Sequence, residues 1–318
     1  MTMHALARVA VLAALLILPS TAVAQKTNVA VGIGDQSTAM MDNPLFTALG
    51  VKKVRYFIKW DTIDRPGELA AADAYVNRAR ALRLQVLMHV SSNDLAIRKA
   101  KLPSVATYKR KVKALVSRYK PQGVKTWGSM NEANHASQPT WNNPKRAAEY
   151  FLALRSICKG CTVLGLYVLD QRGVDRYIDR FYKALGKRKS LVKHVGIHNY
   201  SDTNRSRDTG TRLILKTVKK HNKRTEFWLT ETGGVAKFGG TFTCDPANPA
   251  AAEKRQAKAV NFMFTLTRRF KADVTRLYIY NFTCDDCIGL FDAGLVRTDG
   301  TARPAYDAVK RQMKNFKR

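Results

Sequence analysis

Eight short β-rich runs recur along the chain with amphipathic helical patterns between them, and this alternation restricts the fold more than any other feature. Most runs are continuously apolar, which is typical of parallel strands covered on both faces. They repeat at roughly 35 residues, the length of one βα unit. The predicted strands are Val29–Gly34, Lys53–Ile58, Leu84–Val90, Val124–Met130, Thr162–Leu169, His194–Tyr200, Glu226–Glu231 and Arg276–Phe282.

Helical periodicity fills the intervals between these strands. The clearest predicted helices are Ala71–Arg83, Val105–Tyr119, Pro144–Ile157 and Glu253–Phe270. Eight βα units in one domain indicate an α/β protein with a single (β/α)8 TIM barrel. The competing doubly wound sheet usually has a glycine-rich phosphate loop after its first strand. Here the first strand ends "VGIGDQS", which has no third glycine at the required place, so the barrel is favoured.

The first 24 residues have the pattern of a secretory signal peptide. Arg8 gives a positive start, an apolar stretch follows from Val9 to Leu18, and Ala22-Val23-Ala24 forms a small-residue cleavage site. The apolar stretch is too short for a membrane span, and no later run approaches that length. We expect cleavage near Ala24, one catalytic domain over residues 25–318, and a secreted, periplasmic or cell-envelope protein that does not span the membrane.

The chain is strongly basic, with 55 Lys and Arg against 24 Asp and Glu and a net charge of +31. Such a surface attracts polyanions, and anionic cell-envelope polymers are candidate partners. The basic residues are spread over several helices with no aromatic-interleaved stripe, which argues against a dedicated nucleic-acid site. A generally basic solvated surface remains the alternative.

Five cysteines in an exported chain favour disulfides over a zinc site, for which a fourth ligand is hard to place. We expect a Cys158–Cys161 bridge and a bond from Cys244 to either Cys284 or Cys287, with one thiol left over. Asp285 and Asp286 could hold calcium, but an ordinary solvated loop is favoured. We expect no metal, no organic cofactor and a monomer.

Polar side chains gather where the predicted strands end, the edge at which barrel enzymes place their chemistry. In a very basic protein, the acids cluster on this rim. The strand-end residues are Asp35, Gln36, Arg55, Trp60, Asp61, His89, Asn93, Asn131, Glu132, Asn134, Asp170, His198, Asn199, Tyr200, Glu231, Tyr280, Asn281, Asp285 and Asp286.

Glu132 and Glu231 end the fourth and seventh strands, which face each other across the mouth of an eight-stranded ring. Two carboxylates about 5–5.5 Å apart can cleave a glycosidic bond, one by attacking the sugar carbon and the other by protonating the leaving oxygen. We assign Glu132 as the general acid, with a pKa raised by apolar surroundings, and Glu231 as the nucleophile. Arg55 and Tyr200 are placed to keep Glu231 ionised.

The remaining rim residues have weaker interpretations. Asn131 could hold the sugar 2-hydroxyl group, and His89, Tyr280 and Asn281 are further supporting candidates. His198 and Tyr200 could instead be packed rim residues. Trp60 and Trp141 are candidate sugar-stacking platforms, although a tryptophan that anchors the core or a loop is equally common.

The segment "WGSMNEAN" resembles the W-x-x-x-N-E-P-N segment of clan A retaining glycoside hydrolases, whose cellulase-like and β-xylosidase-like families share this barrel. The resemblance implies Glu132 as acid/base, Glu231 as nucleophile, and supporting roles for Arg55, His198 and Tyr200. "GTARPAY" near the C-terminus is also similar to the clan's entry to its last helix. Two departures are Ala133 in place of proline and a strand-eight end, Tyr280-Asn281-Phe282, that lacks the tryptophan commonly beneath the sugar.

These observations predict a secreted retaining glycoside hydrolase that cleaves a polysaccharide or an envelope glycan by double displacement. A transglycosylase would share every residue named above. A catalytically silent carbohydrate-binding or wall-associated barrel is the alternative from another class. The segment between Gly233 and Glu253, which contains Cys244, is expected to fold over the mouth.

Overall fold

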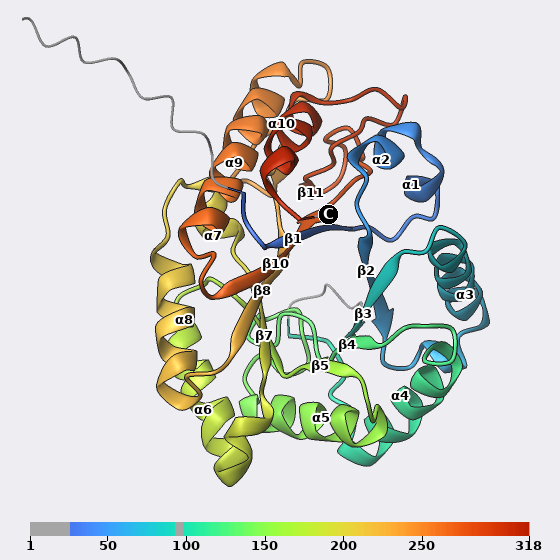
Figure 1. The fold of residues 1–318 in the computed structure, drawn as a ribbon, viewed down its shortest axis with the longest axis vertical. Helices are drawn as coiled ribbons and strands as arrows, with labels where there is room; N and C mark the ends of the chain where they lie inside the picture. The colour runs from blue at the N-terminus through green and yellow to red at the C-terminus, as the bar shows by residue number, and fades with distance from the viewer. Residues whose placement is uncertain (1–25, 93–97, 318) are drawn as a thin grey trace, which may run out of the picture.

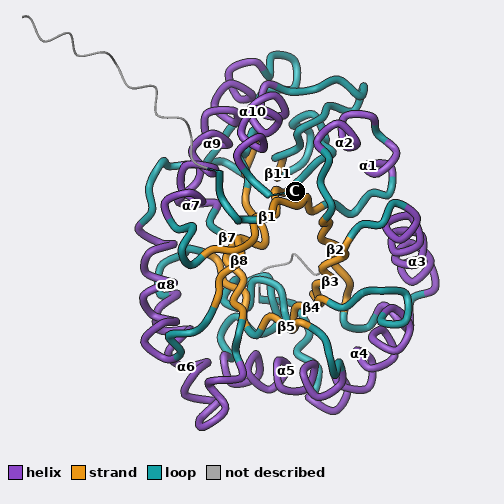
Figure 2. Tube along the Cα trace, viewed as in Figure 1, coloured by secondary structure: helices purple, strands orange, loops and turns teal. Residues whose placement is uncertain are grey.

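The computed structural model describes residues 26–92 and 98–317, so the predicted signal peptide and Asn93 lie outside the described residues. Parallel strands form a central sheet in the order β5-β4-β3-β2-β1-β10-β8-β7-β6. Helices surround this sheet on the outside (Figures 1 and 2). The strands are β1 (Ala30–Gly34), β2 (Lys53–Lys59), β3 (Gln85–Ser91), β4 (Thr126–Gly128), β5 (Thr162–Leu164), β6 (Leu166–Leu169), β7 (His194–His198), β8 (Glu226–Thr232) and β10 (Val274–Tyr280).

The two ends of this strand order are the halves of one interrupted strand. β5 pairs with β4 and β6 pairs with β7, and only Gly165 separates β5 from β6. The Gly165 N–H donates to the carbonyl oxygen of His194 at 3.0 Å, away from the β4 side. The sheet therefore closes into the predicted (β/α)8 barrel. The fifth predicted strand, Thr162–Leu169, is correct in place but is divided in two.

The long helices form the outer ring, and short helices occupy the connections. The long ones are α3 (Pro66–Ala81), α4 (Val105–Tyr119), α5 (Pro144–Ile157), α6 (Val174–Leu185), α8 (Thr209–His221), α9 (Ala250–Arg269) and α10 (Pro304–Gln312). The short ones are α1 (Ala39–Asp42), α2 (Pro44–Leu49) and α7 (Tyr200–Asn204), with 3-10 turns at Thr62–Asp64, Gly186–Leu191 and Met313–Asn315.

Capping residues explain why some helix boundaries could be predicted. The Ser104 hydroxyl accepts a hydrogen bond from the Thr107 N–H at 3.1 Å at the start of α4, and Asn143 caps α5 in the same way. Both helices have the predicted bounds. α3 begins at Pro66, earlier than the predicted Ala71, because proline at the first helical position needs no amide hydrogen bond.

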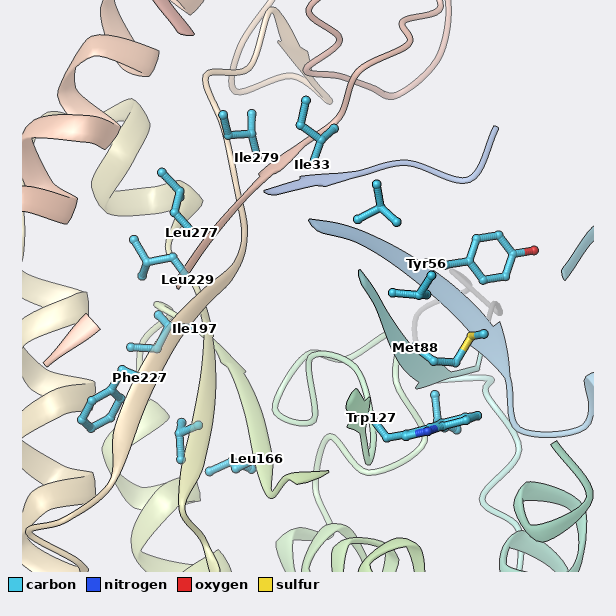
Figure 3. Close-up of a cluster of buried hydrophobic side chains, with 14 of the residues drawn as sticks. Ile33, Tyr56, Met88, Trp127, Leu166, Ile197, Phe227, Leu229, Leu277 and Ile279 are labelled. Carbon is cyan, nitrogen blue, oxygen red and sulfur yellow. The ribbon is translucent and has the colours of Figure 1, made fainter. Parts of the chain in front are cut away.

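The hydrophobic core has two layers. Apolar side chains on the outer face of the strands, such as Met88, Ile197 and Leu277, pack against the helices (Figure 3). A smaller cluster fills the barrel interior and consists of Leu87, Leu164, Tyr167, Trp228 and Tyr278. A Cβ atom at Gly128 or Gly196 would collide with the Tyr167 ring, so glycine is required beside this large interior side chain.

A second, two-stranded antiparallel sheet was not predicted. It pairs β9 (Lys237–Phe238) with β11 (Phe291–Asp292), and so joins the loops that follow β8 and β10. A Cys244–Cys287 disulfide ties the same two loops, and a second disulfide joins Cys158 to Cys161. Both bridges fall within the expected set, and Cys284 is the remaining thiol. Across residues 26–92 and 98–317, no helix has the length and apolar character to cross a membrane.

Candidate active site

A bulge in β8 aims Glu231 at the mouth of the barrel. Ile197 of β7 pairs with Leu229, and the next residue, His198, pairs with Glu231, so β8 contains one extra residue at this point. The pairing with β10 shifts over the same stretch. Trp228 points into the barrel interior, and strict alternation would turn Glu231 outward. The extra residue reverses the in–out alternation of side chains, so Glu231 points into the barrel mouth. Bulges near functional sites often redirect a side chain in this way.

Two donors hold the Glu231 carboxylate. The Arg55 guanidinium donates to Oε2 at 2.8 Å, and the Tyr200 hydroxyl donates to Oε1 at 3.0 Å. The Arg55 and Glu231 side chains are only 1% and 9% exposed, so this ion pair is shielded from water. Burial, followed by the nearby Glu231 charge, raises the pKa of Tyr200 well above its ordinary value. Tyr200 therefore remains a protonated donor.

Arg55 also organises the groups beside Glu231. Arg55 Nε donates to Nδ1 of His89 at 3.2 Å. Arg55 Nη2 donates to the same His89 nitrogen at 2.8 Å and to Oδ1 of Asn131 at 3.1 Å. Burial and the Arg55 charge lower the pKa of His89, so its ring is neutral and Nδ1 can accept. One guanidinium thus fixes Glu231, His89 and Asn131 together.

Glu132 lies in the loop after β4 with a strained backbone. Its φ of +38° is in the left-handed region, which is unusual for glutamate and occurs often at functional sites. Flanking hydrogen bonds hold the loop in place, from the Asn131 N–H to the Val90 carbonyl at 3.0 Å and from the Ala133 N–H to the Tyr167 carbonyl at 2.9 Å. Ala133 therefore permits this loop conformation without the proline of the clan A segment.

His198 contacts the Glu132 carboxyl group. Its Nδ1 lies 3.0 Å from Glu132 Oε1 and 3.6 Å from Glu231 Oε2. Burial, assisted by the Arg55 charge, lowers the pKa of His198 to about 3, so the ring is neutral near physiological pH. Burial also raises the pKa of Glu132, although the charges of His135 and Arg55 oppose this shift. The Glu132 carboxyl group therefore stays protonated to a higher pH than an ordinary glutamate does, while the His198 ring beside it stays neutral.

The two carboxylates are close together. Glu132, His198 and Glu231 each offer one atom within 4.8 Å of the others. This separation agrees with the roughly 5–5.5 Å of retaining glycosidases and is shorter than the roughly 6.5–9.5 Å of inverting ones. The same three groups could in principle hold a metal ion. The Arg55 guanidinium on Glu231 Oε2 opposes a second cation there, so the set is better suited to acid/base chemistry.

Several predicted residues have structural contacts instead. Trp60 packs against the hydrophobic core, and Arg98 lies over the Trp141 ring. The Asn281 amide donates to the Thr283 carbonyl at 2.5 Å. Tyr280 joins a cluster of aromatic rings described below.

Two other rim acids, Asp35 and Asp170, bind backbone N–H groups. Asp35 accepts hydrogen bonds from the N–H groups of Phe282 and Thr283 at 3.0 and 2.8 Å. Asp170 accepts from the first N–H groups of α7, at Ser201 and Asp202. Burial raises the pKa of Asp170 to about 7. The clustering of acids on the rim thus reflects loop anchoring as well as chemistry.

Aromatic residues around the site were missed. The Phe57 ring stacks on the His89 ring with 5.8 Å between the ring centres. The Arg55 guanidinium carbon lies over the same ring, 4.1 Å from its centre. Arg55 and Phe57 are two residues apart on one strand and share a face, so the sequence contained this signal. Phe291 lies 5.6 Å from Tyr200 and 6.0 Å from Tyr280 between ring centres, a contact across separate loops that spacing does not reveal.

Comparison with known proteins gives a fold relationship. No family profile and no curated protein matches the chain. Xylanase XynB from Paenibacillus barcinonensis superposes with a TM-score of 0.63 and 15% identity over 91% of this chain and 99% of its own. Xylanase B from Clostridium stercorarium F9 superposes with a TM-score of 0.64 and 15% identity over 88% of this chain and 96% of its own. A glucosidase from Croceicoccus marinus superposes with a TM-score of 0.66 and 15% identity over 92% of this chain and 68% of its own. The resemblance to clan A glycoside hydrolases therefore holds at the level of the fold: the chain is a (β/α)8 barrel of the kind found in these xylanases and this glucosidase.

Proposed function

We propose that the protein is a secreted retaining glycoside hydrolase in which Glu231 is the nucleophile and Glu132 is the acid/base. The observation that carries this proposal is the approach of the two carboxyl groups to within 4.8 Å across the barrel mouth. The different surroundings of the two acids support different roles. Arg55 and Tyr200 stabilise a carboxylate at Glu231, whereas burial favours a protonated carboxyl group at Glu132.

In the first step, a Glu231 oxygen attacks the anomeric carbon as the bond to the leaving oxygen breaks. Glu132 gives its proton to that oxygen, so the departing sugar leaves as an alcohol and a glycosyl–Glu231 ester remains. Asn131 is held by Arg55 at the position from which its amide can donate to the 2-hydroxyl group. Such a contact strengthens as positive charge develops on the sugar ring.

In the second step, Glu132 is ionised and removes a proton from water as the water oxygen attacks the anomeric carbon. The ester bond to Glu231 breaks, and its electron pair returns to the carboxylate, which Arg55 and Tyr200 again stabilise. Ester formation removes the charge of Glu231 from beside Glu132. The pKa of Glu132 falls as a result, which suits its change from acid to base.

The substrate that we propose is a polysaccharide or an envelope glycan. The N-terminal signal-peptide pattern supports export, and the net charge of +31 supports contact with anionic envelope material. Lysines line two surface cavities on the outer helices, one where α6 and α8 end and the other along α4 beside the end of α5. Lys183, Lys187 and Lys189 line the first, of about 640 Å³, and Lys109, Lys113 and Lys120 line the second, of about 540 Å³. We place the anionic polymer at these cavities, away from Glu132 and Glu231.

Replacing Glu231 with glutamine tests the role of the nucleophile. Glu231→Gln keeps the size of the side chain and a hydrogen-bond acceptor for Arg55 but removes the attacking charge, so turnover should fall on the order of 10⁴-fold or more. Glu226→Gln is the matched control, since Glu226 lies on the same strand with a side chain that is 54% exposed. Circular dichroism should be unchanged for both variants. Equal rates for Glu231→Gln and Glu226→Gln would reject the assignment of Glu231 as the nucleophile.

A further inference from the structure

The small β9–β11 sheet places aromatic rings beside the catalytic mouth. Phe238 and Phe291 are direct partners in this sheet, with ring centres 5.9 Å apart in an edge-on arrangement. The Phe291 ring then meets Tyr200, which donates to Glu231. Tyr200, Phe291 and Phe238 thus form a continuous row that runs outward from the nucleophile. We call this row the aromatic strap.

The aromatic strap is anchored firmly although its outer end is open to solvent. Arg303 donates to both oxygens of Asp292 on β11 at 2.8 Å, and Arg255 donates to the Ala236 carbonyl before β9 at 2.7 Å. The Cys244–Cys287 disulfide joins the two loops beyond the sheet. A rigid support of this kind is typical of a preorganised binding surface.

Folding alone does not explain the exposure of Phe238. Its side chain is 52% exposed, and the neighbouring Ile288 and Leu290 are 77% and 81% exposed. Exposed apolar residues that cluster beside a site mark a binding surface more often than isolated ones do. An aromatic ring offers a flat apolar face that fits the C–H face of a sugar ring, and it loses little conformational entropy on binding.

We propose that the aromatic strap is a subsite for a saccharide unit next to the cleaved bond. The protein would therefore prefer chains of several sugars over glycosides of a single sugar. This inference rests on the proposed glycosidase function, because the row begins at a residue that binds the proposed nucleophile.

The test compares Phe238→Ala with the wild-type protein on matched substrates of one and three sugar units. The sugar is chosen from xylose, glucose and N-acetylglucosamine as the one whose activated 2-fluoro glycoside labels Glu231. The ratio of kcat/KM on the aryl trisaccharide to that on the aryl monosaccharide should fall about 10- to 100-fold in Phe238→Ala, mainly through KM. Phe238→Trp should restore the ratio, because it restores a flat apolar face.

Leu213→Ala is the control, since Leu213 is another exposed apolar residue and lies on helix α8, outside the exposed cluster beside β9 and β11. It should leave the ratio unchanged. An unchanged ratio in Phe238→Ala, with Glu231 still labelled at the wild-type rate, would overturn the subsite alone. Absence of labelling in the wild-type protein with all three sugars would overturn the proposed function and the subsite with it. Loss of a dimer in Phe238→Ala, seen by sedimentation, would assign the surface to a second copy of the chain instead.

Discussion

Glu132 and Glu231 are chemically identical side chains that the surrounding residues make different. The Glu231 oxygens accept hydrogen bonds from the charged Arg55 guanidinium and from the neutral Tyr200 hydroxyl group. Glu132 faces a neutral histidine, because burial prevents the His198 ring from taking up a second proton near physiological pH. The environment therefore favours a proton on Glu132 and directs two donors at Glu231, which suits the acid and the nucleophile that we propose.

The raised pKa of Glu132 predicts the alkaline side of the pH profile of kcat/KM. The pKa of Glu132 is raised above its ordinary value, so its acid form persists to higher pH and activity should be lost as the pH rises through that value. Glu132→Ala should slow cleavage of an unactivated glycan by about 10²- to 10⁴-fold and flatten the alkaline limb of kcat/KM. A dinitrophenyl leaving group needs little protonation, so its release should be affected much less. A profile that keeps its alkaline limb in Glu132→Ala would assign that limb to another group.

At the level of elements, the sequence predicted the repeating pattern but not the local breaks in it. Capping residues and apolar periodicity are local signals, so α4 and α5 could be bounded correctly from Ser104 and Asn143. The β8 bulge depends on pairing with β7 and β10, and the β9–β11 sheet joins loops about 50 residues apart. Such features arise from tertiary pairing, which spacing along one chain does not record.

The same distinction holds among the site residues. Sequence position was enough to select seven site residues that lie in or directly after predicted strands, and the structure brings them together: Glu132, Glu231, Arg55, His198, Tyr200, His89 and Asn131. Strand ends also include acids that anchor loops, such as Asp35, which rim position alone does not distinguish from catalytic ones. Phe291 was missed because its loop returns to the mouth only through β11 and the bond from Arg303 to Asp292.

Interior packing of the barrel predicts a large effect from a very small substitution. A Cβ atom at Gly196 would overlap the Tyr167 ring and the Thr230 hydroxyl group, so Gly196→Ala should lower the free energy of unfolding by about 1–3 kcal/mol. Gly67→Ala is the control, since a Cβ atom there meets nothing within 4 Å and Gly67 lies in helix α3. It should be neutral or stabilising by up to about 1 kcal/mol. Urea titrations would measure both values, and equal stability of the two variants would contradict the packing argument.

On the scale of the whole molecule, the lysine-lined cavities lie away from the paired carboxylates. The carboxylates lie at the C-terminal ends of the strands, one cavity lies where α6 and α8 end, and the other lies along α4 beside the end of α5. Lysines near helix C-termini also complement the helix dipole, which accounts for part of their placement. The arrangement would allow the protein to bind an anionic polymer at these cavities while the mouth remains open to a glycan.

This arrangement predicts that the position of the charge matters as well as its amount. Changing Lys183, Lys187 and Lys189 to glutamate should lower the salt concentration at which the protein elutes from immobilised polygalacturonate, because fewer polymer charges are neutralised. The control changes the exposed Lys145, Lys254 and Lys258 to glutamate, which gives the same net charge near the starts of α5 and α9, at the mouth end of the barrel. Identical elution of the two triple variants would show a diffuse basic surface with no preferred face.

The most direct test of the central claim is the configuration of the first product. Carboxylates within 4.8 Å of each other lead to attack by Glu231 on the sugar, followed by attack of water on the opposite face of the ester. Proton NMR of the reaction, recorded before the product mutarotates, should therefore show a first-formed sugar with the same anomeric configuration as the substrate. First appearance of the opposite anomer would contradict the double displacement and the role of Glu231 as nucleophile.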